Sequence, residues 1–186
     1  MKPVFFHTPS EFRVWLEENH SQQTEIWVGF WKKASGKIGM TYDQALDEAL
    51  CFGWIDGLVN KYDELSYAQR FSPRRSKSVW SKINTQHIER LIKEGKMMPS
   101  GLAAVEAART DGRWERAYES PSNTKVPEDF LKELSKNKKA KTFFKTLNKT
   151  NTFHIAYQLQ SAKKEETRIK RMNKIIQMLE NEEKFY

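Results

Sequence analysis

The chain has little cysteine and no long apolar run, and both shortages narrow what it can be. The single cysteine, Cys51, excludes an internal disulfide, and its apolar neighbours indicate a buried thiol rather than a nucleophile. No stretch approaches the roughly 18 consecutive apolar residues of a membrane-spanning helix. The N-terminal residues also lack the apolar core and cleavage site of a signal peptide. We therefore expect a cytoplasmic protein without a transmembrane segment.

Local motifs for metals, nucleotides and covalent catalysis are also missing. The four histidines are scattered, and none lies three or four residues from another histidine or from the cysteine. The sequence therefore predicts no metal site and no cofactor. Residues 35–39 contain two glycines, but their spacing fits no phosphate-binding loop, and we interpret them as a turn. No catalytic motif is recognisable, which leaves open whether the protein is an enzyme.

Positive charge is in excess and unevenly spread. The net charge is +8, and residues 101–186 carry 18 Lys and Arg against 12 Asp and Glu, compared with 14 against 12 in residues 1–100. A basic surplus favours contact with nucleic acid, phosphate groups or anionic membranes. Lysine-rich surfaces also serve solubility alone, so the charge does not select a ligand.

Capping sequences and alternating apolar residues organise the first part of the chain. Thr8 begins a helix that ends near Asn19, and residues 24–32 alternate as a strand does. Residues 41–53 combine a capping box, an amphipathic helix and a terminal glycine. Residues 54–71 are typical of two strands joined in a hairpin. These patterns predict a small antiparallel sheet with helices packed on it.

The remainder of the chain is predicted to be helical. Apolar residues recur at helical spacing in residues 84–96, 100–110, 127–134, 138–147, 152–160 and 164–180. Residues 119–126 are polar, contain a proline and are the best linker candidate. We therefore predict an α+β domain of about three strands packed by helices over residues 1–118, followed by a helical C-terminal region over residues 127–186.

A basic, aromatic stretch around residues 71–84 is the best candidate for a binding site. Arg74 and Arg75 offer forked donors that suit phosphate or carboxylate, and Lys77 adds a point charge. Trp80 adds a stacking face, and sites for single-stranded nucleic acid combine charge and rings in this way. The alternative is a basic loop with aromatics in the core and arginines paired to acidic neighbours. The candidate residues are Trp54, Asp56, Arg70, Phe71, Arg74, Arg75, Lys77, Trp80 and Asn84.

Asp56 lies between large apolar residues in the Trp-Ile-Asp-Gly segment that follows the second helix. A buried carboxylate needs a partner, and Arg70, Arg74 and Arg75 are the candidates. In one interpretation a salt bridge fixes the hairpin. In the other, Asp56 lies in a pocket as an acid, a base or a ligand anchor.

A second basic face is predicted on the last helix. Its residues are Lys163, Lys164, Arg168 and Arg171, three of which recur at helical spacing. Such a face is usually solvated. The alternatives are a contact with phosphate or nucleic acid, or a surface docked on the first domain.

Five motifs occur in order along the chain, and together they are typical of a known family. They are Thr8-Pro9-x-Glu11-Phe12-x-x-Trp15-Leu16, Ala49-Leu50-Cys51-Phe52-Gly53-Trp54-Ile55-Asp56-Gly57, Phe71-x-Pro73-Arg74-Arg75-x-x-Ser78-x-Trp80-Ser81-x-x-Asn84, Gly95-x-Met97 and Ser161-Ala162-Lys163-x-x-Glu166-Thr167-Arg168-x-x-Arg171. The chain resembles the bacterial YdeI/OmpD-associated, or bacteriocin-protection, proteins. The resemblance implies a link to envelope stress, antimicrobial resistance and association with an outer-membrane porin. It supplies no catalytic residues.

Three functions follow from these patterns. The first is a cytoplasmic stress-tolerance protein that binds an anionic, phosphate-bearing ligand or nucleic acid. The second is an enzyme that acts on a small anionic substrate through Asp56. The third is a protein-interaction module that acts through the C-terminal helices.

Overall fold

The computed structural model describes residues 2–120, 123–162 and 164–185, which form two compact units, residues 1–117 and residues 118–186. The fold class is α+β with a helical C-terminal region, as the sequence predicts. The domain bounds 1–118 and 127–186 stay a prediction. Two residues of the predicted linker, Pro121 and Ser122, lie outside the described residues.

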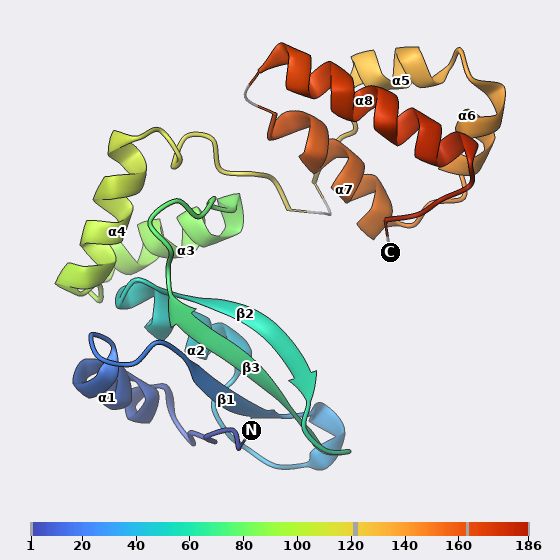
Figure 1. Ribbon diagram of the computed structural model, residues 1–186. Helices are drawn as coiled ribbons and strands as arrows, with labels where there is room; N and C mark the ends of the chain where they lie inside the picture. Colours follow the sequence, from blue (N-terminus) through green and yellow to red (C-terminus); the bar gives the residue numbers. More distant parts are fainter. Residues whose placement is uncertain (1, 121–122, 163, 186) are drawn as a thin grey trace. The chain divides into compact units, whose positions relative to one another are not determined.

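The first unit contains a three-stranded sheet and its covering helices (Figure 1). Its elements are α1 (Pro9–Asn19), β1 (Ile26–Trp31), η1 (Lys33–Ser35), α2 (Tyr42–Cys51), β2 (Trp54–Lys61), β3 (Ser66–Pro73), α3 (Lys82–Lys93) and α4 (Pro99–Thr110). The predicted helix starts are confirmed: Thr8 caps α1, and Thr41 with Gln44 forms a complete capping box on α2. The turn predicted at residues 35–39 begins inside η1 and passes through Gly36 in the left-handed region.

The sheet is antiparallel in the order β1-β3-β2. Phe71 of β3 pairs with Ile26 on one side and with Asp56 on the other. A register shift between Asp56 and Val59 marks a bulge in β2. At the opposite edge the N-terminal segment forms a parallel bridge from Val4 to Val28 of β1.

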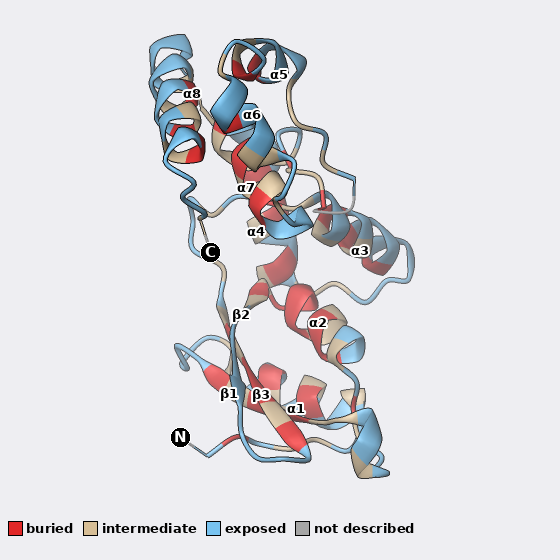
Figure 2. Ribbon diagram, turned by 90° about the vertical axis from the view of Figure 1, so that its right-hand side faces the viewer, coloured by how far each residue is buried: buried red, intermediate tan, exposed pale blue. Residues whose placement is uncertain are grey.

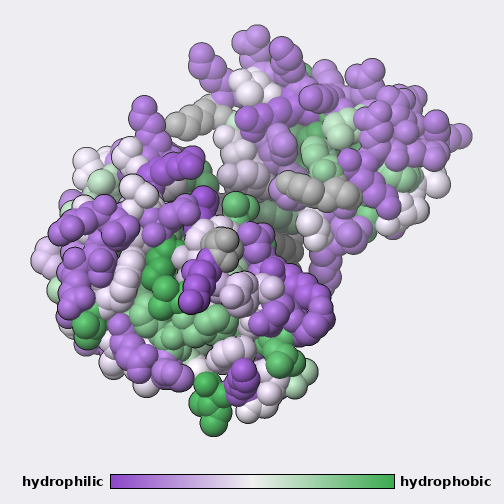
Figure 3. Space-filling view, turned by 60° about the horizontal axis from the view of Figure 1, so that its bottom comes forward, coloured by the Kyte–Doolittle hydropathy of each residue, from purple (hydrophilic) through white to green (hydrophobic). Residues whose placement is uncertain are grey.

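The core of the first unit lies between the sheet and its helices. Ile26, Val28 and Phe30 are buried on one face of β1, as their alternation predicts. Figure 2 shows buried positions on α1, α2 and the strands. Trp54, Phe71 and Trp80 belong to the same core. On the surface, apolar side chains gather on one face of this unit within a hydrophilic border (Figure 3).

Helix α4 packs closely on the end of α2 at Gly101. The carbonyl oxygen of Cys51 accepts a hydrogen bond from the Met98 backbone N–H at 3.0 Å. A Cβ at Gly101 would stand 2.2 Å from that oxygen, so only glycine fits there. Cys51 is buried, as predicted, and burial raises the pKa of its thiol to about 11.

The second unit is a bundle of four helices, α5 (Glu128–Leu134), α6 (Lys138–Phe144), α7 (Lys149–Gln160) and α8 (Glu165–Glu180). Phe130, Ile155 and Leu179 lie in its core. The buried Asn151 accepts a hydrogen bond from the Phe185 backbone N–H at 2.9 Å and thereby ties the last residues to α7. None of the helices in the described part is long and apolar enough to cross a membrane.

Helix α8 ends in a left-handed residue that is not glycine. The N–H groups of Glu182 and Glu183 return to the carbonyls of Leu179 and Met178, a Schellman arrangement. Glu182 has φ of 62° and is the one non-glycine residue with positive φ in the described part of the chain. Its side chain contributes no hydrogen bond or ion pair to the described residues, so the strain has no visible compensation.

We expect Gly101→Ala to destabilise the first unit. Within a helix this change normally stabilises by about 0.5–1 kcal/mol. The new methyl would overlap the Cys51 carbonyl and force α4 away from α2, so we expect a loss of about 2–3 kcal/mol in unfolding free energy. Urea denaturation followed by circular dichroism measures it, with Ala103→Gly at an exposed position of α4 as the control. A gain in stability for Gly101→Ala would contradict the packing described.

We expect Glu182→Gly to stabilise the second unit by about 1 kcal/mol, because glycine adopts the left-handed region without steric cost. The matched control is Glu180→Gly inside α8, which removes the same charge and should lose up to about 1 kcal/mol. Chemical denaturation of the two variants compares them directly. Equal effects at both positions would contradict the assignment of strain to Glu182.

Candidate functional site

We call the loop from Pro73 to Trp80 the basic loop. Two arginine side chains, one from the loop and one from outside it, donate hydrogen bonds to its backbone carbonyls. The Arg74 guanidinium lies 3.6 Å from the centre of the Trp80 ring and donates to the carbonyl of Val79 at 2.7 Å. Arg113 donates to the carbonyl of Ser78 at 3.1 Å. Because two successive carbonyls are bound, the basic loop has a fixed backbone.

Trp80 is at the centre of a larger stack. Its ring lies 5.1 Å from that of Trp114, and the guanidinium of Arg109 lies 5.1 Å from the Trp114 ring. Two neighbouring rings, Trp80 and Trp114, therefore lie between the guanidinium groups of Arg74 and Arg109, and we call these four side chains the arginine–tryptophan stack. Sequence reasoning missed its second half. The signal was present, because residues 109–116 interleave arginine with tryptophan as the basic loop does.

Positive charge dominates the two segments that form this region. Residues 73–80 and 109–116 together carry six Lys or Arg and two Asp or Glu. Asp111 forms an ion pair with Arg113 at 2.7 Å, and the hydrogen bond from Arg113 lowers the pKa of that carboxyl. The residues predicted from sequence as the centre of the site thus lie within a broader basic surface.

Two of the predicted residues extend outward from the basic loop. Arg75 and Lys77 are exposed, and neither side chain makes a hydrogen bond or an ion pair with the part of the chain that the structure describes. Both are therefore available to an external anion. The three predicted rings have a different position: Trp54, Phe71 and Trp80 are all at most 1% exposed and are packed in the core.

The last two predicted residues of this group, Arg70 and Asn84, lie at the margins. Arg70 is half-buried on the sheet and forms an ion pair with Glu25 at 3.4 Å. Asn84 is half-buried in the first turn of α3, where its backbone N–H binds the Ser81 hydroxyl that caps the helix. Neither side chain projects from the basic loop.

Asp56 has a tyrosine as its partner. The Tyr42 hydroxyl donates to the Asp56 carboxylate at 3.0 Å, and among the described residues no arginine lies within ion-pair distance of it. The strand register explains this. Asp56 pairs with Phe71 and shares its face towards α2, whereas Arg70 faces the opposite side. Burial and the Asp56 charge raise the pKa of Tyr42, so its hydroxyl stays protonated at neutral pH.

The second basic face is used largely within the second unit. Arg168 forms a forked ion pair with Asp129 of α5, with Nη2 to Oδ1 at 2.9 Å. Arg171 donates to the carbonyl of Gln158 in α7 at 2.7 Å. Lys164 is exposed at the start of α8, and Lys163 lies outside the described residues. Two of the four residues therefore join α8 to its neighbours.

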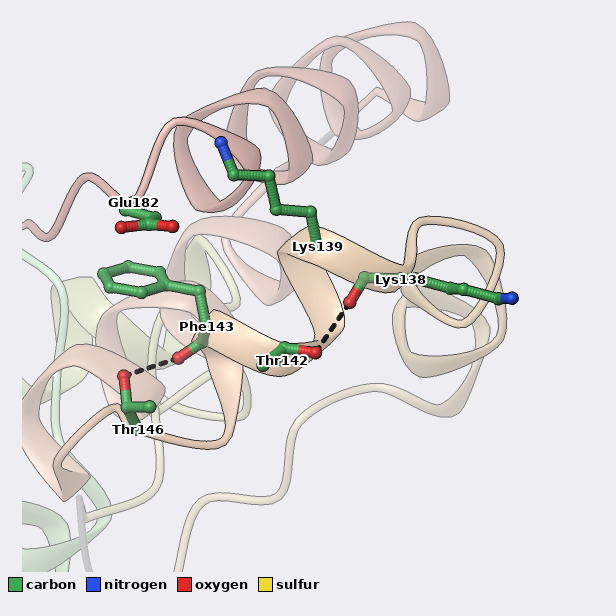
Figure 4. Close-up of a pocket in the computed structure, with 6 residues that line it drawn as sticks. All are labelled: Lys138, Lys139, Thr142, Phe143, Thr146 and Glu182. Atoms are coloured by element: carbon green, nitrogen blue, oxygen red, sulfur yellow. Dashed lines mark hydrogen bonds between the residues drawn. The ribbon is translucent and has the colours of Figure 1, made fainter.

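A cavity of about 460 Å³ opens on the second unit between α6 and the end of α8. Figure 4 shows the Glu182 carboxylate beside the Phe143 ring, while the Lys138 ammonium points away. The hydroxyl of Thr142 donates to a carbonyl of its own helix at 2.9 Å, and that of Thr146 does so at 2.7 Å. The cavity thus offers few groups that converge on a ligand. In the described residues no cluster of three or more metal-ligating side chains is found anywhere.

We expect Arg168→Ala to lower the unfolding free energy of the second unit by about 1 kcal/mol, since a partly exposed ion pair is screened by solvent. Lys164→Ala on the same face is the matched control and should change the unfolding free energy little.

Arg168 lowers the pKa of Asp129, so the stabilisation by this ion pair is present at neutral pH and shrinks as pH falls below the ordinary carboxyl value of about 4. Denaturation of both variants across pH measures this, and equal effects of the two changes would exclude a bracing role for Arg168.

Comparison with known proteins divides the chain in two. Residues 4–104, more than half of the chain, match the family model described as a domain of unknown function (DUF8412). Residues 123–182 match the family model described as bacteriocin-protection, YdeI or OmpD-associated. No curated protein and no solved structure matches the chain.

The family predicted from the motifs is therefore confirmed over residues 123–182, a segment that includes the motif with Arg168 and Arg171. The motifs before residue 104 lie in the segment that matches the other family model. The chain belongs to the family defined by that domain of unknown function over residues 4–104, and over residues 123–182 it carries a domain of the bacteriocin-protection, YdeI or OmpD-associated family.

Proposed function

We propose that the protein binds an anionic, phosphate-bearing ligand or nucleic acid at the basic loop, and that it serves stress tolerance in the cytoplasm. The observation that carries this proposal is the pair Arg75 and Lys77, whose exposed side chains have no partner in the described part of the chain, on a loop held at Ser78 and Val79 by two arginines. A preformed loop loses little conformational freedom on binding, so more of the contact energy contributes to affinity.

Each predicted residue takes a role that suits its position. Arg75 supplies a forked donor and Lys77 a point charge to the ligand. Arg74 acts through the backbone of the basic loop, where it binds the carbonyl of Val79. Trp80 supports the loop from the core rather than stacking on a base. Binding is then governed by phosphate charge more than by base identity.

The stress-tolerance role and the porin association come from the family label of the C-terminal domain. A role in protein interaction is the second candidate. Among the described residues of 127–180, the large apolar side chains that are exposed are Leu131 and Ile169. Two such side chains are a small surface for a protein partner, so the observations favour the anion. Catalysis through Asp56 has only the Tyr42 contact in its favour.

We expect Arg75→Glu/Lys77→Glu to weaken binding of single-stranded nucleic acid by at least about tenfold at low salt. The dependence of affinity on salt should also become shallower, by about two phosphate contacts. Tryptophan fluorescence measures the affinity, because the buried ring of Trp80 is part of the basic loop and contacts Arg74. Single-stranded DNA, RNA, nucleotides and anionic vesicles form the panel, each at low and high salt.

Lys2→Glu/Lys93→Glu is the matched control, since both lysines are exposed and lie outside the basic loop. It reverses the same number of charges and should leave the salt dependence nearly unchanged. If both double variants lose binding equally, the interaction reflects net charge and the basic loop is not the site. No binding by any member of the panel would discard the proposal.

A further inference from the structure

A cavity of about 480 Å³ lies on the first unit and shares no residue with the basic loop or the arginine–tryptophan stack. It is enclosed by the end of β1, the segment 32–41 and the start of α2, with Tyr67 of β3 as part of its wall. Pockets for small organic ligands have volumes of about 300–1,000 Å³. The sequence does not predict this cavity, because residues 35–39 have the pattern of a plain turn.

Aromatic rings form the wall of this cavity. Phe30 and Tyr67 stack with centroids 5.4 Å apart and planes 27° apart. Tyr42 meets Phe30 edge-on at 6.3 Å. Phe30 is 2% exposed and supports the wall from the core, so the half-buried rings of Tyr42 and Tyr67 are the surface that a planar ligand can contact.

Lysines surround the same cavity. Lys33 is exposed, and its side chain has no partner among the described residues. Lys37 lies 4.0 Å from the centre of the Trp31 ring, which positions its ammonium group. Lys32 donates to the carbonyl of Glu64 at 3.1 Å, so it keeps its charge without an acidic partner at that contact. Among the described residues that line the cavity three are lysines and none is acidic.

The tyrosine hydroxyls add a polar contact at the wall. The Tyr42 hydroxyl is directed to Asp56, whereas that of Tyr67 makes no hydrogen bond with the described residues. Burial and the charge of Asp43 raise the pKa of Tyr67, so its hydroxyl stays protonated and can donate.

The rim of the cavity carries an unusually exposed apolar side chain. Ile38 is 91% exposed although it lines the opening. The segment that carries it is anchored, because a Cβ at Gly39 would stand 3.1 Å from Trp31 and the Met40 N–H binds the carbonyl of Phe6 at 3.2 Å. A ligand in the cavity would cover Ile38 and remove apolar surface from water.

We propose that this cavity binds a small aromatic anion, a planar ring system that bears one phosphate or carboxylate group. The ring packs against Tyr42 and Tyr67, and the anionic group meets Lys33 and Lys37. The Tyr67 hydroxyl donates to the same anionic group. This inference is independent of the function proposed for the basic loop.

The test uses 1-naphthyl phosphate and 1-naphthoate as probes with the full chain. Inorganic phosphate and acetate serve as ring-free controls, and 1-naphthol serves as the uncharged control. Calorimetric titration gives the affinity, and amide shifts in a ¹⁵N-labelled sample locate the contact. We expect both or one of the aromatic anions to bind at least about tenfold more tightly than any control, with shifts confined to residues 30–42 and 67. The difference between the two probes identifies the preferred anionic group.

Variants separate this site from the basic loop. Lys33→Glu/Lys37→Glu should weaken probe binding by at least about tenfold, and Tyr67→Phe, which keeps the ring, should weaken it about fivefold. Lys2→Glu/Lys93→Glu carries the same charge change and should bind normally. The proposal is overturned if neither aromatic anion binds, if the ring-free anions bind as well, or if Lys33→Glu/Lys37→Glu binds as the unaltered chain does. Nucleic-acid binding that persists in Lys33→Glu/Lys37→Glu would leave the function of the basic loop standing on its own.

Discussion

The position of Phe71 in the central strand determines how every candidate side chain of the first unit is oriented. Phe71 faces the core beside Ile26 and Asp56, and Arg70 consequently faces the other side of the sheet. A slip of one residue would exchange the two faces along the whole strand. The contact between Tyr42 and Asp56 and the point at which the basic loop leaves β3 both depend on this register.

The arginines of this protein differ in what they bind, and the difference governs the electrostatics. Arg171 donates to a backbone carbonyl, which orders the side chain without cancelling its charge. Arg168 binds a carboxylate, and the pair is close to neutral as a unit. The first arrangement gives rigidity together with a positive field, whereas the second gives rigidity alone. Both kinds of contact occur around the basic loop, where Arg74 donates to the carbonyl of Val79 and Arg113 forms an ion pair with Asp111.

Much of the fold could be predicted from sequence because its signals are local. The capping residues Thr8 and Thr41 and the alternation of β1 act over a few residues, and the structure confirms the elements that they predict. The candidate site was harder to predict from sequence. The partner of Asp56 depends on strand register, and the approach of Trp114 to Trp80 joins segments far apart in sequence. The rings of the candidate residues Trp54, Phe71 and Trp80 are in the core, since composition does not distinguish a ring that binds from a ring that packs.

The two edges of the small sheet are closed to other strands by different means. On β1 the N-terminal segment occupies the edge, where the Gly29 N–H donates to the carbonyl of Val4 at 2.8 Å and the Val4 N–H donates to the carbonyl of Trp27 at 2.8 Å. On β2 the bulge after Asp56 interrupts the regular spacing of donors and acceptors near the exposed Leu58 and Val59. A strand from another molecule therefore finds the β1 edge already paired and the β2 edge without a regular row of donors and acceptors. This protects a three-stranded sheet with apolar edge residues against self-association at high concentration.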